Sequence, residues 1–436
     1  MSKFIRTSNH TLKFSNINKL NSLNSFILEY KRVAKIYLNY IWNNHFSNSY
    51  NSKNKIVTNH FNANTKLNLP NRLSTVKINK NINLSTTLTS RTLQCCLNQV
   101  LSIIRGDIEK QRKRQYVVNK LRSQSKKVPG KLRKAVKNNK PVKPDLSNLQ
   151  PELNINCIDF QETDSHFNAF IRLKSFTTEV RNKSIKFPIK YSKVSNKWKK
   201  QGKILNSFLF SPTSVNIRYE IEKTVKTKGK TVGADQGVRT VLTLSDKQVT
   251  GNKDIHNHTL ESIIQRLSRK KKGSKAFGRT QIHRKNFINY SINKLNFSNI
   301  KEVKLEKVKQ LRYKSKSSRY LSHWTYTNIS DKLKRTCEEQ EVLLTLQSSV
   351  YRSQRCSQCG LVRKSQRKGK NFSCKNCGLE IDADLNASLN HQQDIPEVPY
   401  DLRRLNLNRL GFFWMSNGFY SLAGEELIVS LPKKVS

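Results

Sequence analysis

The sequence predicts a multidomain α+β protein whose C-terminal half is an α/β unit. Residues 231–350 alternate strand-like segments with amphipathic helical segments, which is the pattern of an α/β domain. Residues 151–230 hold short segments of alternating apolar side chains, and residues 16–125 hold two segments with apolar residues at helical spacing. A chain of 436 residues has room for about two to four domains.

The chain is strongly basic. Its 82 lysines and arginines against 29 acidic residues give a formal net charge of +53. Such a surface repels itself unless a polyanion neutralises it, and a phosphate backbone does so while releasing its bound counterions. We therefore expect a nucleic acid partner whose binding weakens steeply with salt. No apolar run is long enough to span a bilayer, so we expect no membrane partner.

The first residues and the cysteines indicate the compartment. The N-terminal segment lacks the apolar core of a signal peptide, and the eight cysteines are not spaced as a disulfide framework. These features predict an intracellular protein located with DNA. Its place would be the cytoplasm or nucleoid of a prokaryote or phage host, or an organelle or nucleus.

Residues 1–15 are predicted to form a strand-like segment, and residues 16–125 two helices. The apolar face of the first helix is formed by Ile27, Tyr30, Ala34, Tyr37 and Ile41. The apolar face of the second helix is formed by Leu93, Leu97, Val100, Leu101 and Ile104. The second helix runs into a basic stretch whose candidate nucleic-acid contacts are Lys110, Arg112, Lys113 and Arg114. A solvated helix face is the alternative interpretation, and the net charge favours phosphate contact.

Residues 126–150 combine prolines and a glycine with many lysines, which is typical of a linker. After the linker, short apolar alternations predict strands over 154–160, 167–173, 185–191, 208–210 and 215–221. Several short strands close together predict a small β-barrel or sheet domain in residues 151–230.

The predicted α/β region opens with an acid, Asp235, at the start of an alternating strand. The next helix turns Leu260, Ile263, Ile264 and Leu267 inward and presents Arg266, Arg269 and Lys270 outward as further candidate nucleic-acid contacts. A strand over 301–306 ends in Glu306, a helix covers 323–340, and a strand over 342–346 leads to a cysteine cluster. In His256-Asn-His258 the central residue is polar, unlike that of a tyrosine-type transposase motif, and we interpret this pattern as a loop coincidence.

Residues 351–380 contain a four-cysteine motif formed by Cys356, Cys359, Cys374 and Cys377. Two thiols at C-x2-C spacing can hold one ion from a tight turn, and Gly360 and Gly378 permit the backbone to fold back. Four thiolates predict one tetrahedral Zn²⁺, and the site is structural because no coordination position stays open for a substrate. Paired thiols without a metal, or with a disulfide, are the alternative.

Acidic residues are scarce, so those in apolar or basic surroundings are candidate metal ligands. Asp235, Glu306 and Asp384 are such residues. Converging carboxylates can hold the two divalent cations that commonly assist phosphodiester cleavage. Asp235 alone could be a turn residue, and capping of the helix that follows explains Asp382 or Asp384 equally well.

Three segments resemble motifs of the TnpB family, the RNA-guided nucleases of insertion sequences, which are related to type V CRISPR effectors and Fanzor proteins. GADQGVRTVLTLSD at 233–246 resembles the first RuvC motif, VYRSQRCSQCG at 350–360 the start of the zinc ribbon, and IDADLNASLN at 381–390 the third RuvC motif. The order and spacing of the motifs agree with the family over roughly residues 230–390.

The resemblance implies an RNase H-like (RuvC) nuclease domain in residues 231–350 and 381–400, with a zinc ribbon inserted at 351–380. It also implies a helical recognition region in residues 16–125 and a β-barrel wedge-like domain in residues 151–230, joined by the strand in residues 1–15. Asp235, Glu306 and Asp384 would be the catalytic residues and would hold two Mg²⁺ ions. The tail, residues 401–436, has no role that we can predict.

The implied activity is RNA-guided, Mg²⁺-dependent DNA cleavage at a single RuvC-like site. The partners would be a guide RNA and a double-stranded target DNA whose displaced single strand enters the site. Two departures from the family pattern are Gln236, which replaces an apolar residue, and the heavily charged strand before Glu306, so Glu302 stays open as the second acid. A catalytically silent repressor of the same fold and a guide-independent nuclease stay open as alternatives.

Overall fold

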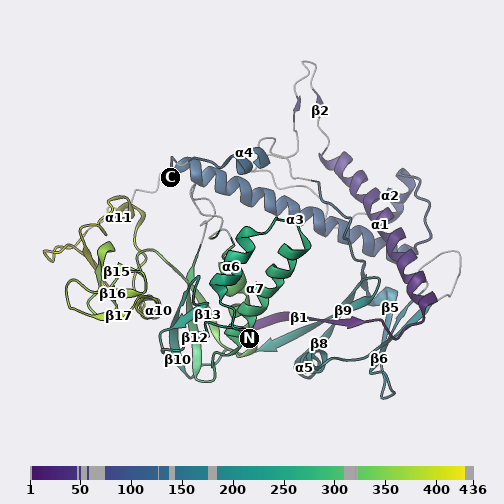
Figure 1. Cartoon of the computed structure of the whole chain (residues 1–436). Coiled ribbons are helices and arrows are strands. Elements are labelled where there is room, and N and C mark those ends of the chain that lie inside the picture. Colours follow the sequence, from purple (N-terminus) through teal and green to yellow (C-terminus); the bar gives the residue numbers. More distant parts are fainter. Residues whose placement is uncertain are drawn as a thin grey trace. The chain divides into compact units, whose positions relative to one another are not determined.

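The computed structural model in Figure 1 describes residues 2–46, 49–50, 56–57, 74–125, 127–136, 143–174, 184–308, 320 and 323–427. The chain divides into two compact units, Lys3–Glu222 and Lys223–Ser436. Each unit contains helices and sheets of its own, which confirms the predicted multidomain α+β class. No helix in the described part of the chain has the length and apolar character that crossing a membrane requires.

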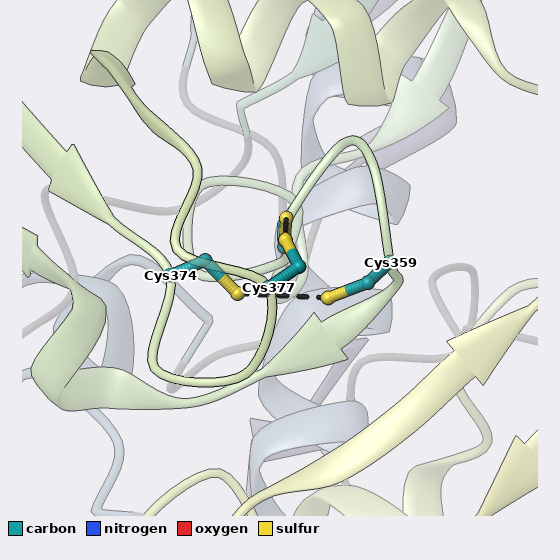
Figure 2. A group of neighbouring side chains, drawn as sticks. Cys359, Cys374 and Cys377 are labelled. Carbon is teal, nitrogen blue, oxygen red and sulfur yellow. Dashed lines mark hydrogen bonds between the residues drawn. The ribbon is translucent and has the colours of Figure 1, made fainter.

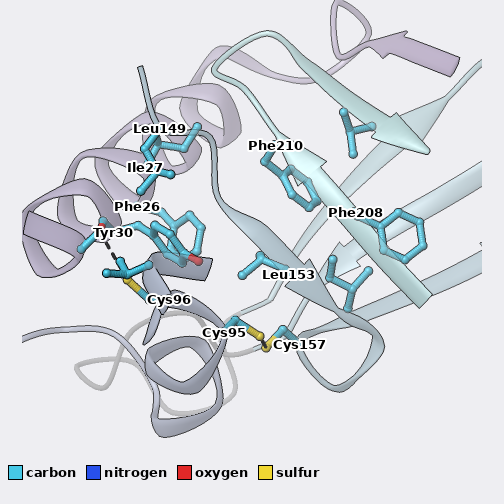
Figure 3. Packing of buried hydrophobic residues seen from close by; sticks show 14 of the residues in the cluster. Phe26, Ile27, Tyr30, Cys95, Cys96, Leu149, Leu153, Cys157, Phe208 and Phe210 are labelled. Atoms are coloured by element: carbon cyan, nitrogen blue, oxygen red, sulfur yellow. Dashed lines mark hydrogen bonds between the residues drawn. The ribbon is translucent and has the colours of Figure 1, made fainter. Parts of the chain in front are cut away.

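Two long helices, α1 and α3, dominate the N-terminal unit. The helices of this unit are α1 (Ile17–Phe46), α2 (Thr75–Asn81), α3 (Ser90–Ser123), α4 (Gly130–Val136) and α5 (Lys193–Gln201). The apolar faces predicted for α1 and α3 are buried and share one core. In this core Phe26 and Tyr30 lie near Cys95 and Cys96 (Figure 3). The helix α4 lies inside the predicted linker, so part of that segment is regular structure.

The strands of the N-terminal unit form two main sheets. One has the order β1-β9-β8-β4 and the other the order β5-β6-β7. Their bounds are β1 Ser2–Thr11, β4 Glu152–Asn154, β5 Ile158–Glu162, β6 Ala169–Leu173, β7 Ile185–Ile189, β8 Gly202–Phe210 and β9 Ser214–Lys223, and β2 (Ser49–Tyr50) pairs separately with β3 (Ile56–Val57).

The predicted closed barrel is not found among the described residues. The strands β1 and β4 lie at opposite edges of the four-stranded sheet, and β5, β6 and β7 pair with one another in a sheet of their own. Alternating apolar residues show that one face of a strand is buried, but they do not determine whether a sheet closes on itself. The prediction of strands was therefore sound, whereas the prediction of a barrel was wrong.

A four-stranded sheet of order β11-β10-β12-β13 forms the centre of the C-terminal unit. Its strands are β10 (Lys230–Gln236), β11 (Leu242–Leu244), β12 (Ile300–Lys307) and β13 (Leu343–Ser348). The strands β10, β12 and β13 are parallel, and β11 pairs antiparallel with β10. Val232, Ala234, Val303 and Leu305 are almost fully buried, as expected for parallel strands covered by helices. This arrangement confirms the predicted α/β alternation.

Four main helices belong to this unit: α6 (Leu260–Arg269), α7 (Lys275–Asn293), α9 (Tyr326–Glu339) and α10 (Ala383–Gln392). The side chain of Thr259 accepts a hydrogen bond from the Ser262 backbone, and the Ser274 side chain caps α7 in the same way. The helices α6 and α7 pack side by side (Figure 1). The sequence predicted α6 and α9 but not α7.

Short strands surround the cysteine motif: β14 (Leu361–Val362), β15 (Arg367–Lys368), β16 (Asn371–Ser373) and β17 (Glu380–Asp382). The tail contributes α11 (Tyr400–Arg404), β18 (Phe412–Met415) and β19 (Gly418–Tyr420). The strand β18 pairs antiparallel with β14 and β19 with β18, and both Phe412 and Trp414 are buried. The aromatic tail therefore completes a sheet beside the cysteines.

Candidate functional site

Asp235 and Glu306 are neighbours on adjacent parallel strands. The register pairs Ala234 of β10 with Leu305 of β12, so the next residue on each strand is one of the two acids. Ala234 and Leu305 are fully buried on one face of the sheet. Because side chains alternate along a strand, both acids project from the opposite face.

The helix α10 brings Asp384 to the same place. It packs closely across β10 at Gly233, where an added Cβ would lie 2.9 Å from the His391 carbonyl carbon. Glycine is needed here because the helix and strand backbones nearly touch. Asp384 is buried, and its charge is close enough to raise the pKa of both Asp235 and Glu306. The structure therefore brings the three predicted acids together.

The two alternative acids lie outside this cluster. The Asp382 carboxylate accepts hydrogen bonds from the backbone N–H groups of Asp384 and Leu385, at 2.9 and 3.0 Å, so Asp382 is the N-terminal cap of α10. Glu302 lies four residues before Glu306 on β12. Its carboxylate accepts hydrogen bonds from the hydroxyls of Thr345 (2.6 Å) and Thr231 (3.3 Å). Each therefore has a structural partner already.

The electrostatics of the acid cluster favour a bound cation. Burial raises the pKa of Asp235 well above its usual range, and the nearby charges of Glu306 and Asp384 raise it further. Burial also raises the pKa of Glu306 to about 7, although the Gln236 N–H, 3.4 Å from its carboxylate, opposes the shift. Ionised carboxylates that lie close together repel one another, and positive charge placed between them relieves the repulsion. A divalent cation would supply that charge, so the donor set fits such an ion.

His391 is a further candidate ligand that the sequence did not reveal. One imidazole nitrogen, one oxygen of Asp235 and one of Glu306 lie within 4.8 Å of one another. The side chain is buried, and its Nδ1 has no hydrogen-bond partner in the described residues. Burial lowers the pKa of His391 to about 3, so the ring is neutral and able to bind a metal. Its spacing of seven residues from Asp384 on one helix was the signal available in the sequence.

Two basic side chains from the cysteine-rich segment hold Asp384. Arg367 Nη2 lies 3.0 Å from Asp384 Oδ1, and Lys370 Nζ contacts Oδ2. Lys370 also donates to Thr240 at 3.3 Å. In the described structure these two cations neutralise the Asp384 carboxylate, as a bound metal ion would otherwise do.

Buried amides connect α10 to the cysteine motif. Asn386 donates to the Arg355 carbonyl at 2.8 Å and accepts from the Ser357 N–H at 3.0 Å. Asn390 donates to the same Arg355 carbonyl at 2.7 Å and accepts from the Arg355 guanidinium at 2.5 Å. Both amides are fully shielded from solvent, where leaving such groups unpaired costs about 1–3 kcal/mol each.

The four predicted cysteines meet in one cluster (Figure 2). The Sγ atoms are 3.6 Å apart for Cys356 and Cys377 and 3.5 Å apart for Cys359 and Cys374. A disulfide would need about 2.05 Å. Four sulfurs at about 2.3 Å from a tetrahedral Zn²⁺ lie roughly 3.8 Å from one another, so the cluster could hold this ion. Gly360 and Gly378 have φ angles of +77° and +71°, as the two tight turns require.

Comparison with known proteins identifies the segment that contains α9, the cysteines and α10. The family described as Cas12f1-like, TNB domain matches residues 326–391. This match confirms the predicted resemblance to the TnpB and type V family. The matched segment includes the four cysteines, Asp384 and His391.

Two curated proteins share sequence with the chain, and both are named CRISPR-associated endodeoxyribonuclease Cas12f1. The protein from Sulfoacidibacillus thermotolerans is 39% identical over 74 residues, and that from Syntrophomonas palmitatica is 34% identical over 62 residues. These matches span 17% and 14% of this chain and 18% and 12% of the relatives. The chain thus spans less than a fifth of the length of the curated relatives it matches.

Solved structures of effector proteins also align with the chain. A Cas12f1–sgRNA–target DNA complex aligns at 13% identity over 87% of this chain and 83% of that chain, with a TM-score of 0.48. CasPhi-2 (Cas12j) bound to crRNA aligns at 10% identity over 91% of this chain and 99% of that chain, with a TM-score of 0.45.

The predicted nucleic-acid contacts lie outside the matched segment, residues 326–391. On α3, Lys110 pairs with Asp107 and Arg112 with Glu109, each at 2.5 Å. These pairs are exposed and contribute little to stability, so phosphates can compete for the basic groups. Arg114 is half-buried, whereas Lys113 and Arg269 are exposed. Arg266 on α6 is half-buried with its Nη2 shielded from solvent, and Lys270, the residue after α6, donates to Thr280 Oγ1 at 2.8 Å.

Proposed function

We propose that this protein is an RNA-guided DNA endonuclease of the TnpB and type V kind. The observation that carries the proposal is the convergence of Asp235, Glu306 and Asp384 from β10, β12 and α10 into one cluster whose electrostatics favour a bound cation. The curated relatives that share sequence with the chain are named endodeoxyribonucleases, which supports the same chemistry.

The three acids would form the single cleavage site of an RNase H-like (RuvC) domain and would hold two Mg²⁺ ions. When bound, such ions activate the attacking water and stabilise the leaving oxygen. The protein would contribute the position of each carboxylate, fixed by the register of β10 and β12 and by the packing of α10. Arg367 and Lys370 would release Asp384 to the metal and turn toward a phosphate group. The four cysteines would hold one structural Zn²⁺ in a ribbon at residues 351–380.

The remaining regions would bind nucleic acid. A net charge of +53 favours a phosphate-rich partner, and we propose a guide RNA together with a double-stranded target DNA. Residues 16–125 would be the recognition region, with Lys110, Arg112, Lys113 and Arg114 on phosphates. Residues 151–230, with the first strand, would act as a wedge-like domain at the target duplex. The displaced strand would reach the acids past Arg266, Arg269 and Lys270, inside a cell and in contact with DNA.

Cleavage by purified protein tests the proposal. RNA that co-purifies with the chain would be sequenced, and its spacer would be reprogrammed against a plasmid. We expect Mg²⁺-dependent cutting that follows the guide and that the Asp235→Ala, Asp384→Ala double variant abolishes without loss of RNA binding. Glu302→Gln is the matched control, because it alters an acid on β12 outside the cluster, and it should cut normally.

Three outcomes would overturn this assignment. Persistent cutting by the double variant would show that Asp235 and Asp384 do not take part in cleavage. Equal cutting of branched DNA by RNA-free protein would instead indicate a guide-independent nuclease. A silent DNA-binding repressor would bind its guided target and cut nothing under any of the metal conditions tested.

A further inference from the structure

A third group of side chains that could hold a metal ion lies outside both the acid cluster and the cysteine cluster. Asp254 and His258 belong to the loop between β11 and α6, and His283 lies on α7. One ligand atom from each of the three lies within 4.8 Å of the other two. All three residues are half-buried, and the two imidazole rings meet edge to face at 5.1 Å between centroids.

Both imidazoles converge on one carboxylate oxygen. His283 Nε2 lies 2.7 Å from Asp254 Oδ2, and His258 Nδ1 lies 3.6 Å from the same oxygen. The longer separation is not a hydrogen bond. His258 Nδ1 is shielded from solvent and has no hydrogen-bond partner in the described structure. The hydrogen bond with His283 is a sufficient partner for Asp254 Oδ2. Hydrogen bonding therefore does not explain why His258 Nδ1 also faces this oxygen.

An ion shared by the three groups explains this arrangement. Ligand atoms bound at about 2.0–2.1 Å to a tetrahedral Zn²⁺ lie roughly 3.3 Å apart. The two observed separations, 2.7 and 3.6 Å, bracket that value. Small shifts of the rings would therefore bring all three atoms to bonding distance from one ion.

The surrounding backbone holds the carboxylate in a suitable orientation. Asp254 Oδ1 accepts hydrogen bonds from the N–H groups of His256 and His258, both at 2.9 Å, which leaves Oδ2 to face the rings. Asn257 has a φ angle of +61°, and its N–H bonds to the Asp254 carbonyl at 3.0 Å, which closes the turn. Partners that orient a ligating carboxylate in this way are typical of metal sites.

We propose that Asp254, His258 and His283 form a third metal site, of the zinc type, that joins the loop before α6 to α7. Two imidazoles and one carboxylate suit Zn²⁺, whereas Mg²⁺ prefers oxygen ligands alone. Three protein ligands leave one position for water or for His256, whose ring lies 6.3 Å from that of His258 on the same turn. The site stands independently of the proposed nuclease activity.

Zinc content of the full-length protein tests this site. Wild-type protein and the His258→Ala variant would be loaded with Zn²⁺, dialysed against a weak chelator, and measured by plasma mass spectrometry. We expect the variant to hold one zinc fewer per chain, whatever the total in the wild type. Removing this ligand should weaken binding at the site by roughly 100-fold or more. His166→Ala, an exposed histidine in the N-terminal unit, is the matched control and should keep the wild-type content.

Substitution with Co²⁺ distinguishes this site from the cysteines. Thiolate ligands produce intense ligand-to-metal charge-transfer bands, and a histidine–carboxylate site produces only weak visible bands. His258→Ala should lose part of the weak absorption and keep the thiolate bands. The variant removes no hydrogen bond made by Nδ1, so its circular dichroism should match that of the wild type. Equal zinc content in the His258→Ala and wild-type proteins would overturn the proposal.

Discussion

Replacing Gly233 with alanine should push α10 away from β10. A Cβ at this position would overlap the Ser388 carbonyl oxygen and the Gln392 nitrogen, and would lie 2.9 Å from the His391 carbonyl carbon. Non-bonded carbon atoms pack at about 3.5–4.0 Å, so the helix would have to withdraw by roughly 1 Å. None of these neighbours is a flexible side chain that could move aside, because all three atoms belong to the α10 backbone.

This withdrawal would act on both stability and cleavage. Overpacking of a buried contact typically costs about 1–3 kcal/mol of unfolding free energy. The helix carries Asp384, and a displacement of ~1 Å at a catalytic group can lower a rate about 100-fold. We therefore expect Gly233→Ala to lower the free energy of unfolding by about 1–3 kcal/mol, measured by urea denaturation. The rate of single-turnover cleavage of a guided target should fall about 100-fold.

Gly278→Ala is the matched control. Gly278 lies in α7, and a Cβ there would meet nothing within 4 Å. Alanine in a helix interior should raise the free energy of unfolding by about 0.5–1 kcal/mol and leave cleavage unchanged. If both variants unfold at the same urea concentration and cleave at the same rate, Gly233 does not determine the position of α10.

Changes at the metal-binding residues should have distinct effects. Cys374→Ser should release the zinc of the cysteine cluster and lower the melting temperature, measured with a chromogenic zinc chelator and by circular dichroism; unchanged zinc retention would contradict the four-thiolate site. In EDTA, the raised pKa of Glu306, about 7 against an ordinary 4.5, means that the folded state binds more protons than the unfolded state between these values. Stability should therefore fall as pH rises through this window, and Glu306→Gln should flatten the fall in urea denaturation; an unaltered slope would exclude Glu306 as its source. Lys370→Met should lower several-fold the Mg²⁺ concentration needed for half-maximal cleavage, because Lys370 Nζ no longer competes for Asp384; an unchanged or higher requirement would argue against this competition.

Much of the C-terminal fold could be predicted because its signals are local. The alternation of Val303 and Leu305 with charged residues identifies β12, and the spacing of Leu260, Ile263, Ile264 and Leu267 identifies α6. Asp235 was expected at the start of a strand, whereas it lies near the end of β10. The helix α7 escaped prediction because its first turns contain Gly278 and many polar residues, which weaken the apolar stripe. Its buried side chains, including Phe287 and Ile292, depend on packing against α6 and the sheet.

The candidate site shows where local signals fail. Helix capping could not distinguish Asp382 from Asp384 in the sequence, and only the resemblance to the family motif selected Asp384. In the structure Asp382 is the cap, and Asp384 is buried. His258 and His283 are separated by a loop and most of two helices, so their approach to Asp254 depends on tertiary packing. A polar residue at position 236, which departs from the family pattern, was also explained only by its contact with Glu306.

The strand β17 ends at Asp382 and α10 begins at the next residue, so the ribbon sheet continues directly into the helix that carries Asp384. This continuity sets an order of events during biosynthesis. Asp235 and Glu306 leave the ribosome before either cysteine pair, and the third acid follows the last cysteine. A nascent or prematurely terminated chain would carry basic surfaces for nucleic acid but only two of the three acids. Under the proposed function, synthesis would deliver the binding surfaces first and the complete acid cluster last, so unfinished copies would lack the proposed cleavage site.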